Sequence, residues 1–158
     1  MSATGLDVFD RTIHLTNSWL DEISNRLEVK MMSPPRDRQV AWHALGAVLR
    51  AVRDRVPIEL AAHLGAQLPL IVRGTFYDQW RPGETPQKWR TAEEFLAVVA
   101  AQLNSLGPVV GASDAADAVF RVLNHHVDPG QIEKVRHALP AEIRMLWPEN
   151  NQQDTRAA

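Results

Sequence analysis

The sequence predicts an all-α protein of about eight helices, arranged as two pseudo-repeated four-helix modules. Two observations lead to this fold class. First, apolar residues recur at steps of three and four along most of the chain, which is the spacing of one helix face, and no segment alternates as a half-buried strand does. Second, the later part of the chain repeats the earlier part at a nearly constant offset, as duplicated structural units do.

The first module is expected over residues 7–80 and opens with two long helices. A break at residues 31–35, which contain two prolines, separates them, and the second helix is expected to begin near Pro35 because proline fits a first helical turn. Each helix carries a one-sided apolar stripe, as helices packed on a core do. The stripes consist of Phe9, Ile13, Thr16, Leu20, Ile23 and Leu27 in the first helix, and of Val40, Ala44, Ala47, Val48, Ala51 and Val52 in the second.

Proline also delimits the next two helices. Pro57 opens a third helix, and Pro69 forces a kink or a fresh start, because proline removes a backbone donor inside a helix. A short fourth helix is expected over Leu70–Tyr77. Residues 81–90 have the proline and glycine content of a loop, so they are predicted to connect the two modules.

The second module is expected over residues 91–148. Thr91 and Glu94 form a capping box for its first helix, because each side chain can bond the other residue's backbone N–H. Asp128 is a cap for the third helix, and Pro140 opens the fourth. A polar tail over residues 149–158 is expected to be disordered.

The internal repeat is the strongest signal in the sequence. Residues 47–76 align with residues 118–147 at a shift of 71 without a gap, and seven positions are identical where composition alone would give about two. A residue kept at the same place in both modules is expected to serve the fold, and a residue special to one module is freer to serve a site. The identical pairs are Ala47/Ala118, Val48/Val119, Arg50/Arg121, Val56/Val127, Leu68/Leu139, Pro69/Pro140 and Arg73/Arg144.

Composition argues against several classes of function. A net charge of −2 gives no overall attraction to nucleic acid or to an anionic membrane surface. Cysteine is absent, so the chain has no disulfide framework, thiolate metal site or cysteine nucleophile. No stretch approaches the ~18 uninterrupted apolar residues of a membrane span, and the first ten residues do not resemble a signal peptide. We therefore expect a soluble, cytoplasmic protein without nucleic-acid or membrane partners.

The sequence contains no recognisable catalytic or cofactor motif. It lacks a nucleophile elbow, a phosphate-binding loop and a dinucleotide fingerprint, which argues against an enzyme without excluding one. Its six histidines form no HxxxH pair, and the adjacent His125 and His126 are expected to point to different faces of a helix. We accordingly predict no catalytic residues, no cofactor and no metal.

The candidate binding residues lie in or near residues 73–90, which we call the aromatic–arginine segment. Four of the ten aromatic residues fall within positions 76–89, and aromatic residues beside arginines are typical of binding hot spots. They are equally typical of a connector packed in the seam between two modules, and both interpretations stay open. Arg73 matches Arg144 in the other module, which favours a structural role for it, and Phe76 matches Trp147, which favours packing. The candidates are Arg73, Tyr77, Trp80, Arg81 and Trp89, together with His63.

Several runs of residues carry a resemblance to a known family. They are Asp37-Arg38-Gln39 to Ala44-Leu45 followed by Val48-Leu49-Arg50, Ala61-Ala62-His63-Leu64-Gly65-Ala66-Gln67-Leu68-Pro69 leading to Arg73-Gly74-x-Phe76-Tyr77-x-x-Trp80, Glu94-Phe95-Leu96, Ala118-Val119-Phe120, and Val135 through Leu139-Pro140 to Leu146-Trp147-Pro148. Over about residues 15–148 the chain resembles a bacterial family described only as domain of unknown function 2267. The resemblance implies a small, soluble, helical bacterial protein, and it implies no activity and no catalytic residues.

These patterns favour a non-catalytic binding or adaptor protein. It would bind a protein partner or a small ligand through the aromatic–arginine segment or the groove between the modules, and a homodimer is one form that such small modules can take. The alternative is a small-molecule sensor or enzyme with a pocket between the modules. That alternative requires His63, Arg73 and Tyr77 to converge on one cavity.

Overall fold

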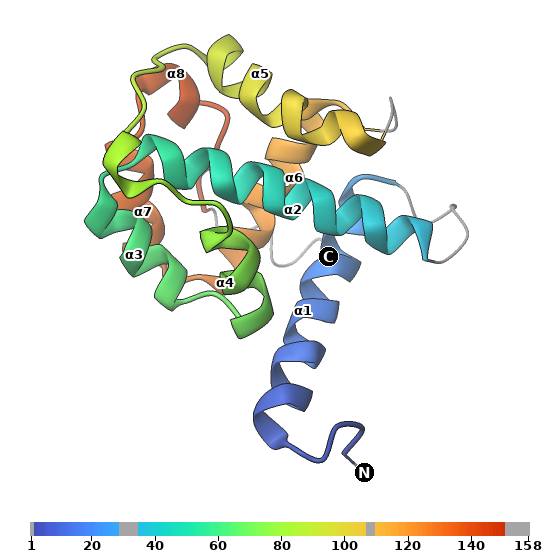
Figure 1. The fold of residues 1–158 in the computed structure, drawn as a ribbon. Coiled ribbons are helices and arrows are strands. Elements are labelled where there is room, and N and C mark those ends of the chain that lie inside the picture. Colours follow the sequence, from blue (N-terminus) through green and yellow to red (C-terminus); the bar gives the residue numbers. More distant parts are fainter. Residues whose placement is uncertain (1, 29–34, 107–109, 151–158) are drawn as a thin grey trace.

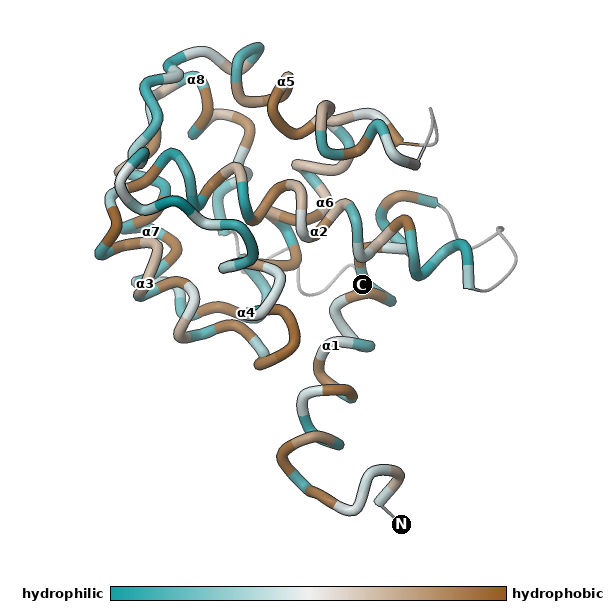
Figure 2. Tube along the Cα trace, viewed as in Figure 1, coloured by the Kyte–Doolittle hydropathy of each residue, from teal (hydrophilic) through white to brown (hydrophobic). Residues whose placement is uncertain are grey.

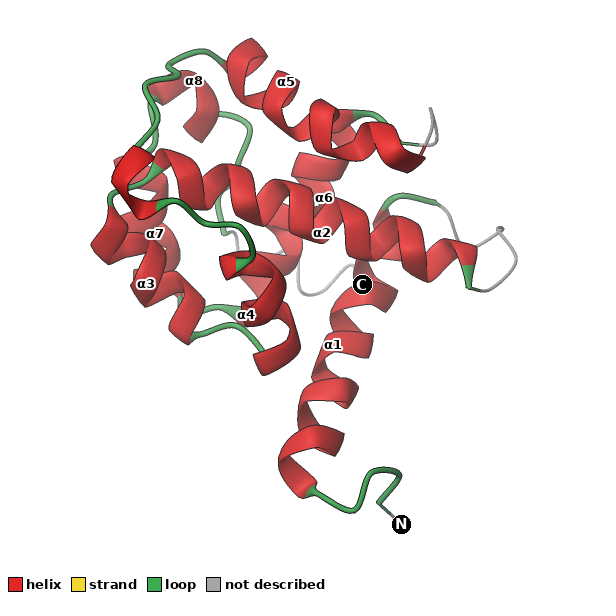
Figure 3. Cartoon of the chain, viewed as in Figure 1, coloured by secondary structure: helices red, strands yellow, loops and turns green. Residues whose placement is uncertain are grey.

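The structure is a computed structural model that describes residues 2–28, 35–106 and 110–150. These residues form eight α-helices and two short 3-10 helices without any strand, so the predicted all-α class is confirmed (Figure 3). Most of the predicted break at 31–35 and of the predicted tail at 149–158 lies outside the described residues. The helices are α1 (Asp7–Arg26), α2 (Arg36–Arg55), α3 (Ile58–Ala66), α4 (Leu70–Tyr77), α5 (Ala92–Leu103), α6 (Ala112–His126), α7 (Pro129–Ala138) and α8 (Ala141–Arg144).

Helix α2 is the centre of the fold. Figure 1 shows it crossing the middle of the molecule, and α1, α3, α4, α5 and α6 all contact it. Residues 44–49 are buried without interruption, as expected of a helix surrounded by others. The small residues Ala44 and Ala47 lie in this stretch and leave room for the neighbouring helices, whereas the space beside Gly46 is taken by the guanidinium of Arg50 in the same helix.

Helix boundaries in the two halves of the chain recur at the same offset. Helices α3 and α4 begin at Ile58 and Leu70, and α7 and α8 begin 71 residues later, at Pro129 and Ala141. The predicted duplication requires such a recurrence, and the duplication itself stays a prediction. The buried apolar residues of both halves, apart from Val40, belong to one cluster, so the two halves share a single core.

A row of stacked aromatic rings fills the core of the second half. Phe120 lies between Phe95 and Trp147, with ring centroids 6.1 Å and 4.2 Å away, and the Trp147 ring is nearly parallel to it at 7°. Trp147 is 1% exposed, and its indole Nε1 donates a hydrogen bond of 2.7 Å to Asn124 Oδ1. The segment that follows α8 is therefore anchored in the core.

Helix α1 leaves the body of the protein. Figure 1 shows its C-terminal half against the other helices and its N-terminal half extending away from them, and Figure 2 shows hydrophobic residues along both halves. Trp19, Leu20 and Ile23 are buried in the C-terminal half, and Thr12 and Thr16 are buried in the N-terminal half. None of the described helices combines the length and the apolarity needed to cross a membrane.

Candidate functional site

The aromatic–arginine segment begins as a part of the core. Phe76 is fully buried, as its match to Trp147 favours. Arg53, itself 4% exposed, donates hydrogen bonds through Nη1 to the carbonyl oxygens of Phe76 (2.8 Å) and Asp78 (2.9 Å). This buried arginine of α2 therefore holds the chain in place where α4 ends.

Tyr77 and Trp80 form a stacked pair next to α3. Their ring centroids are 5.4 Å apart, and the Tyr77 hydroxyl donates to the carbonyl oxygen of Ala62 at 3.3 Å. The hydroxyl lies directly over Gly65, where a Cβ atom would overlap it. Both rings are half-buried and pack against the core, so only part of each is open to a partner.

The remaining candidates of this segment do not gather at one place. Trp89 is half-buried with its ring 6.3 Å from Phe95, and its carbonyl oxygen accepts a hydrogen bond from Arg55 Nε at 2.7 Å. Arg81 and His63 are exposed, and Arg81 Nη1 lies 3.6 Å from a carboxylate oxygen of Glu84.

Arg73 and Arg144 make the same set of hydrogen bonds at corresponding positions. Each guanidinium donates to three backbone carbonyl oxygens at or just after the C-terminal end of the preceding helix, where helical carbonyls lack partners. Both side chains are thus used inside the fold. The acceptors are Gly65 (2.8 Å), Ala66 (3.1 Å) and Leu68 (3.1 Å) for Arg73, and Arg136 (2.9 Å), His137 (3.2 Å) and Leu139 (2.9 Å) for Arg144.

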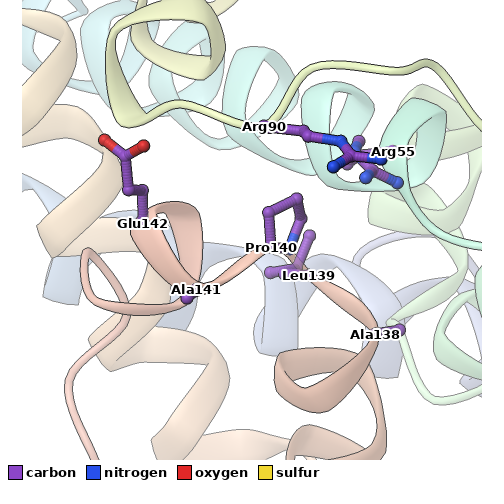
Figure 4. A pocket seen from close by; sticks show the side chains of 7 residues that line it. All are labelled: Arg55, Arg90, Ala138, Leu139, Pro140, Ala141 and Glu142. Atoms are coloured by element: carbon purple, nitrogen blue, oxygen red, sulfur yellow. The ribbon is translucent and has the colours of Figure 1, made fainter.

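An open depression of about 440 Å³ lies where α2 ends, beside the turn between α7 and α8 (Figure 4). Arg55 and Arg90 line one side of it and Glu142 lines another. Burial and the nearby charge of Arg90 both lower the pKa of Arg55. Among the described residues neither guanidinium forms an ion pair with a carboxylate, so the two cations are suited to hold an anionic group. This depression is not lined by His63, Arg73 or Tyr77.

The second surface feature is apolar, and we call it the α1–α4 surface. Its side chains are 40–56% exposed, although the sequence pattern places two of them, Phe9 and Ile13, on the stripe of α1 that is expected to face the core. Thr12 Oγ1 accepts a hydrogen bond of 3.1 Å from the backbone N–H of Ile71, which joins the start of α4 to α1 here. The α1–α4 surface consists of Leu6, Val8, Phe9, Ile13 and Leu15 of α1 and its N-terminal flank, and of Leu70 and Ile71 of α4.

A third feature is a cluster of one glutamate and two histidines between α1 and α6. Glu22 Oε1 lies 3.0 Å from His125 Nδ1 and 2.7 Å from His126 Nε2. The expectation that the two histidines point apart is wrong, because both rings contact the same carboxylate. His125 reaches Glu22 through Nδ1, the nitrogen nearer its backbone, and His126 reaches it through the distal Nε2. Burial alone would raise the pKa of Glu22, but its hydrogen bonds to His126 and His125 outweigh burial and lower that pKa below its usual value.

Sequence reasoning missed this cluster because Glu22 lies 103 and 104 residues before the two histidines. Within the described ranges it is the one group of three side chains that could act as metal ligands together. Two imidazoles and a carboxylate are a donor set that zinc and similar ions accept.

Comparison with known proteins identifies the family of the chain. The family model described as "Uncharacterized conserved protein (DUF2267)" matches residues 16–146 of the chain. The search of curated proteins gave no match. The matched range contains Glu22, both histidines of the cluster, and Arg55 and Arg90, whereas the N-terminal half of α1 precedes it.

Proposed function

The chain belongs to the DUF2267 family of uncharacterized conserved proteins, a description that names no activity. For this member of the family we propose the function of a non-catalytic binding protein. An amphipathic helix of a protein partner docks on the α1–α4 surface. The exposure of five apolar side chains along the first three turns of α1 and its N-terminal flank supports this proposal. Apolar side chains left exposed together on the surface of a monomer often mark a site where a partner docks.

The spacing of these side chains indicates a helix as the occupant. Leu6, Phe9 and Ile13 continue the steps of three and four by which Thr16 and Leu20 pack on the body. Apolar residues with this alternating spacing form the seam along which two helices pair. The body covers this seam from Thr16 onward, so a second helix can cover the part over Leu6, Phe9 and Ile13.

The charges beside the seam favour a basic partner over a second copy of this chain. Asp7 and Asp10 lie in the first turn of α1, and Arg11 is the one cation of this half of the helix. Hydrogen bonds from the hydroxyls of Ser2 and Thr4 lower the pKa of Asp10, which keeps this carboxylate ionised. Two copies of an acidic helix end would repel each other, whereas lysines bordering the partner's apolar stripe would be attracted.

The substitution Ile13→Asp tests the docking proposal. The probe is a synthetic helical peptide with leucines at heptad spacing bordered by lysines, and a second peptide carries glutamates in place of the lysines. We expect the lysine peptide to bind the full chain and Ile13→Asp to weaken binding about 10- to 100-fold, the loss of one buried isoleucine. Fluorescence anisotropy of the labelled peptide measures the affinity.

Ile58→Asp is the matched control, because Ile58 is 43% exposed on α3 and Ile13 is 40% exposed on α1. It should bind the lysine peptide as the unchanged chain does. The docking proposal is contradicted if the Ile13→Asp and Ile58→Asp variants bind the lysine peptide equally well. It is also contradicted if neither peptide binds the unchanged chain. Light scattering measures the oligomeric state of the unchanged chain and of the Ile13→Asp variant. A dimer that Ile13→Asp converts to a monomer would identify a second copy of this chain as the occupant and would overturn the proposal of a basic helix as partner.

A second candidate function, binding of a small anionic ligand, is favoured by the paired guanidinium groups of Arg55 and Arg90. Inorganic phosphate and acetate are the probes, and chemical shifts of backbone amides around residues 138–142 report binding. We expect Arg90→Gln to abolish these shifts and Arg81→Gln, which removes an exposed arginine of the same connecting segment, to leave them unchanged. Shifts that persist in Arg90→Gln would rule out this site.

A further inference from the structure

We propose that Glu22, His125 and His126 form a binding site for a divalent transition-metal ion of the zinc type, which joins α1 to α6. Nothing in the family description assigns a metal to this chain. The site does not depend on the docking proposal. Glu22 lies in the C-terminal half of α1, the two histidines lie at the end of α6, and the exposed apolar side chains lie in the N-terminal half of α1 and its flank.

The distances fit a single ion. Glu22 Oε1, His125 Nδ1 and His126 Nε2 lie within 4.8 Å of one another, and the carboxylate oxygens are 2.7–3.1 Å from the two nitrogens. A tetrahedral zinc ion at its usual bond lengths places its ligand atoms about 3.3 Å apart. The carboxylate oxygens and the two nitrogens are thus already close to the spacing that one ion requires, and an ion can replace the protons that now lie between them after an adjustment of the side chains.

The donor set selects the class of ion. Imidazole nitrogen binds zinc, nickel, copper and cobalt, whereas calcium and magnesium require an arrangement made mostly of oxygen atoms. Three protein ligands leave at least one position of a zinc ion for water or another ligand. The side chain of His125 is 53% exposed, so solvent reaches the cluster from its side.

The surroundings hold one of the three ligands, His126, in place. The Trp19 ring stacks on His126 with centroids 5.1 Å apart and an angle of 22°, and Trp19 is 2% exposed. This contact fixes the plane of one imidazole, as the supporting residues of metal sites do. Glu22 and His126 expose only 27% and 23% of their side chains, which limits the water that an ion would have to displace.

The same three side chains could instead form only an ion pair that ties α1 to α6. Zinc titration of the full chain, prepared without a histidine tag, separates the two roles. We expect one zinc ion per chain by isothermal titration calorimetry, and a visible absorption spectrum of bound Co²⁺ that indicates nitrogen and oxygen ligands. Zinc should also slow amide hydrogen exchange in the C-terminal half of α1, because the ion fastens this half to α6.

Two variants remove one ligand each. His125→Asn is the cleaner one, because its half-exposed side chain contributes little to packing, and Glu22→Gln keeps a group that can hydrogen-bond the histidines. Each is expected to weaken zinc binding at least tenfold and to remove the cobalt spectrum. Circular dichroism checks that both variants remain folded.

His137→Asn is the matched control. His137 is also an exposed histidine with a glutamate partner, Glu133, at 3.3 Å, and this pair includes no second histidine. This variant should bind zinc as the unchanged chain does. If the unchanged chain binds no zinc, or if His125→Asn and Glu22→Gln bind it as tightly as His137→Asn, the cluster is an ion pair only and the proposed metal site is wrong.

Discussion

Replacing Trp147 by alanine is expected to destabilise the protein by about 3–5 kcal/mol, as large-to-small changes of buried aromatic residues do. Its ring stacks on Phe120 at 4.2 Å and is 1% exposed, so alanine leaves a cavity beside that ring. The change also removes the donor that satisfies Asn124 Oδ1. Urea unfolding followed by circular dichroism measures the loss, which would be a large part of the total stability of a domain of this size.

Met145→Ala is the control for this prediction. Met145 lies two residues before Trp147 and is 85% exposed, so its replacement should change the free energy of unfolding by no more than about 0.5 kcal/mol. A loss below about 1 kcal/mol for Trp147→Ala would contradict the prediction. It would mean that the chain after α8 is not anchored in the core.

Local sequence signals predicted the helix boundaries well, because each signal acts within a few residues. The capping box at Thr91 is confirmed, since Glu94 N donates to Thr91 Oγ1 at 3.1 Å and the Glu94 carboxylate accepts from Thr91 N. Asp128 accepts from Gln131 N at 3.1 Å, as a helix cap should. Pro69 directly precedes α4, whose bounds Leu70–Tyr77 match the prediction.

The candidate surfaces could not be predicted in the same way, because they depend on where the body of the protein ends. Phe9 and Ile13 follow the same pattern as the buried Leu20, and the sequence alone cannot distinguish a covered part of a stripe from an uncovered one. The metal-ligand cluster requires α1 to pack on α6, which no local pattern encodes. The rule that adjacent helical residues point to different faces describes the directions of their Cα–Cβ bonds. It does not hold for atoms further along a side chain, such as the ring nitrogens of His125 and His126.

Arg53→Met is expected to destabilise the protein by about 2–4 kcal/mol, because it leaves two carbonyl oxygens without the charged donor that now serves both. Methionine keeps most of the volume of the side chain, so the loss reports the hydrogen bonds to Phe76 and Asp78, together with the ion pair between Arg53 Nε and Asp54 Oδ1 at 2.8 Å. Urea unfolding measures it, and hydrogen exchange at residues 76–80 should become faster, because the start of the aromatic–arginine segment loses its link to α2. In the other half of the chain the corresponding position is Asn124, whose Nδ2 donates to the carbonyl oxygen of Pro148 at 2.8 Å.

Arg53→Lys separates the charge of this side chain from its geometry. Lysine carries the same charge on a single ammonium group, which lacks the planar fork of the guanidinium, so it should recover only part of the lost stability. Full recovery would mean that a buried positive charge suffices. A loss below about 0.5 kcal/mol in Arg53→Met would mean that the two carbonyl groups find other partners. In that case the position shared by Arg53 and Asn124 would not fasten the end of the fourth helix in each half.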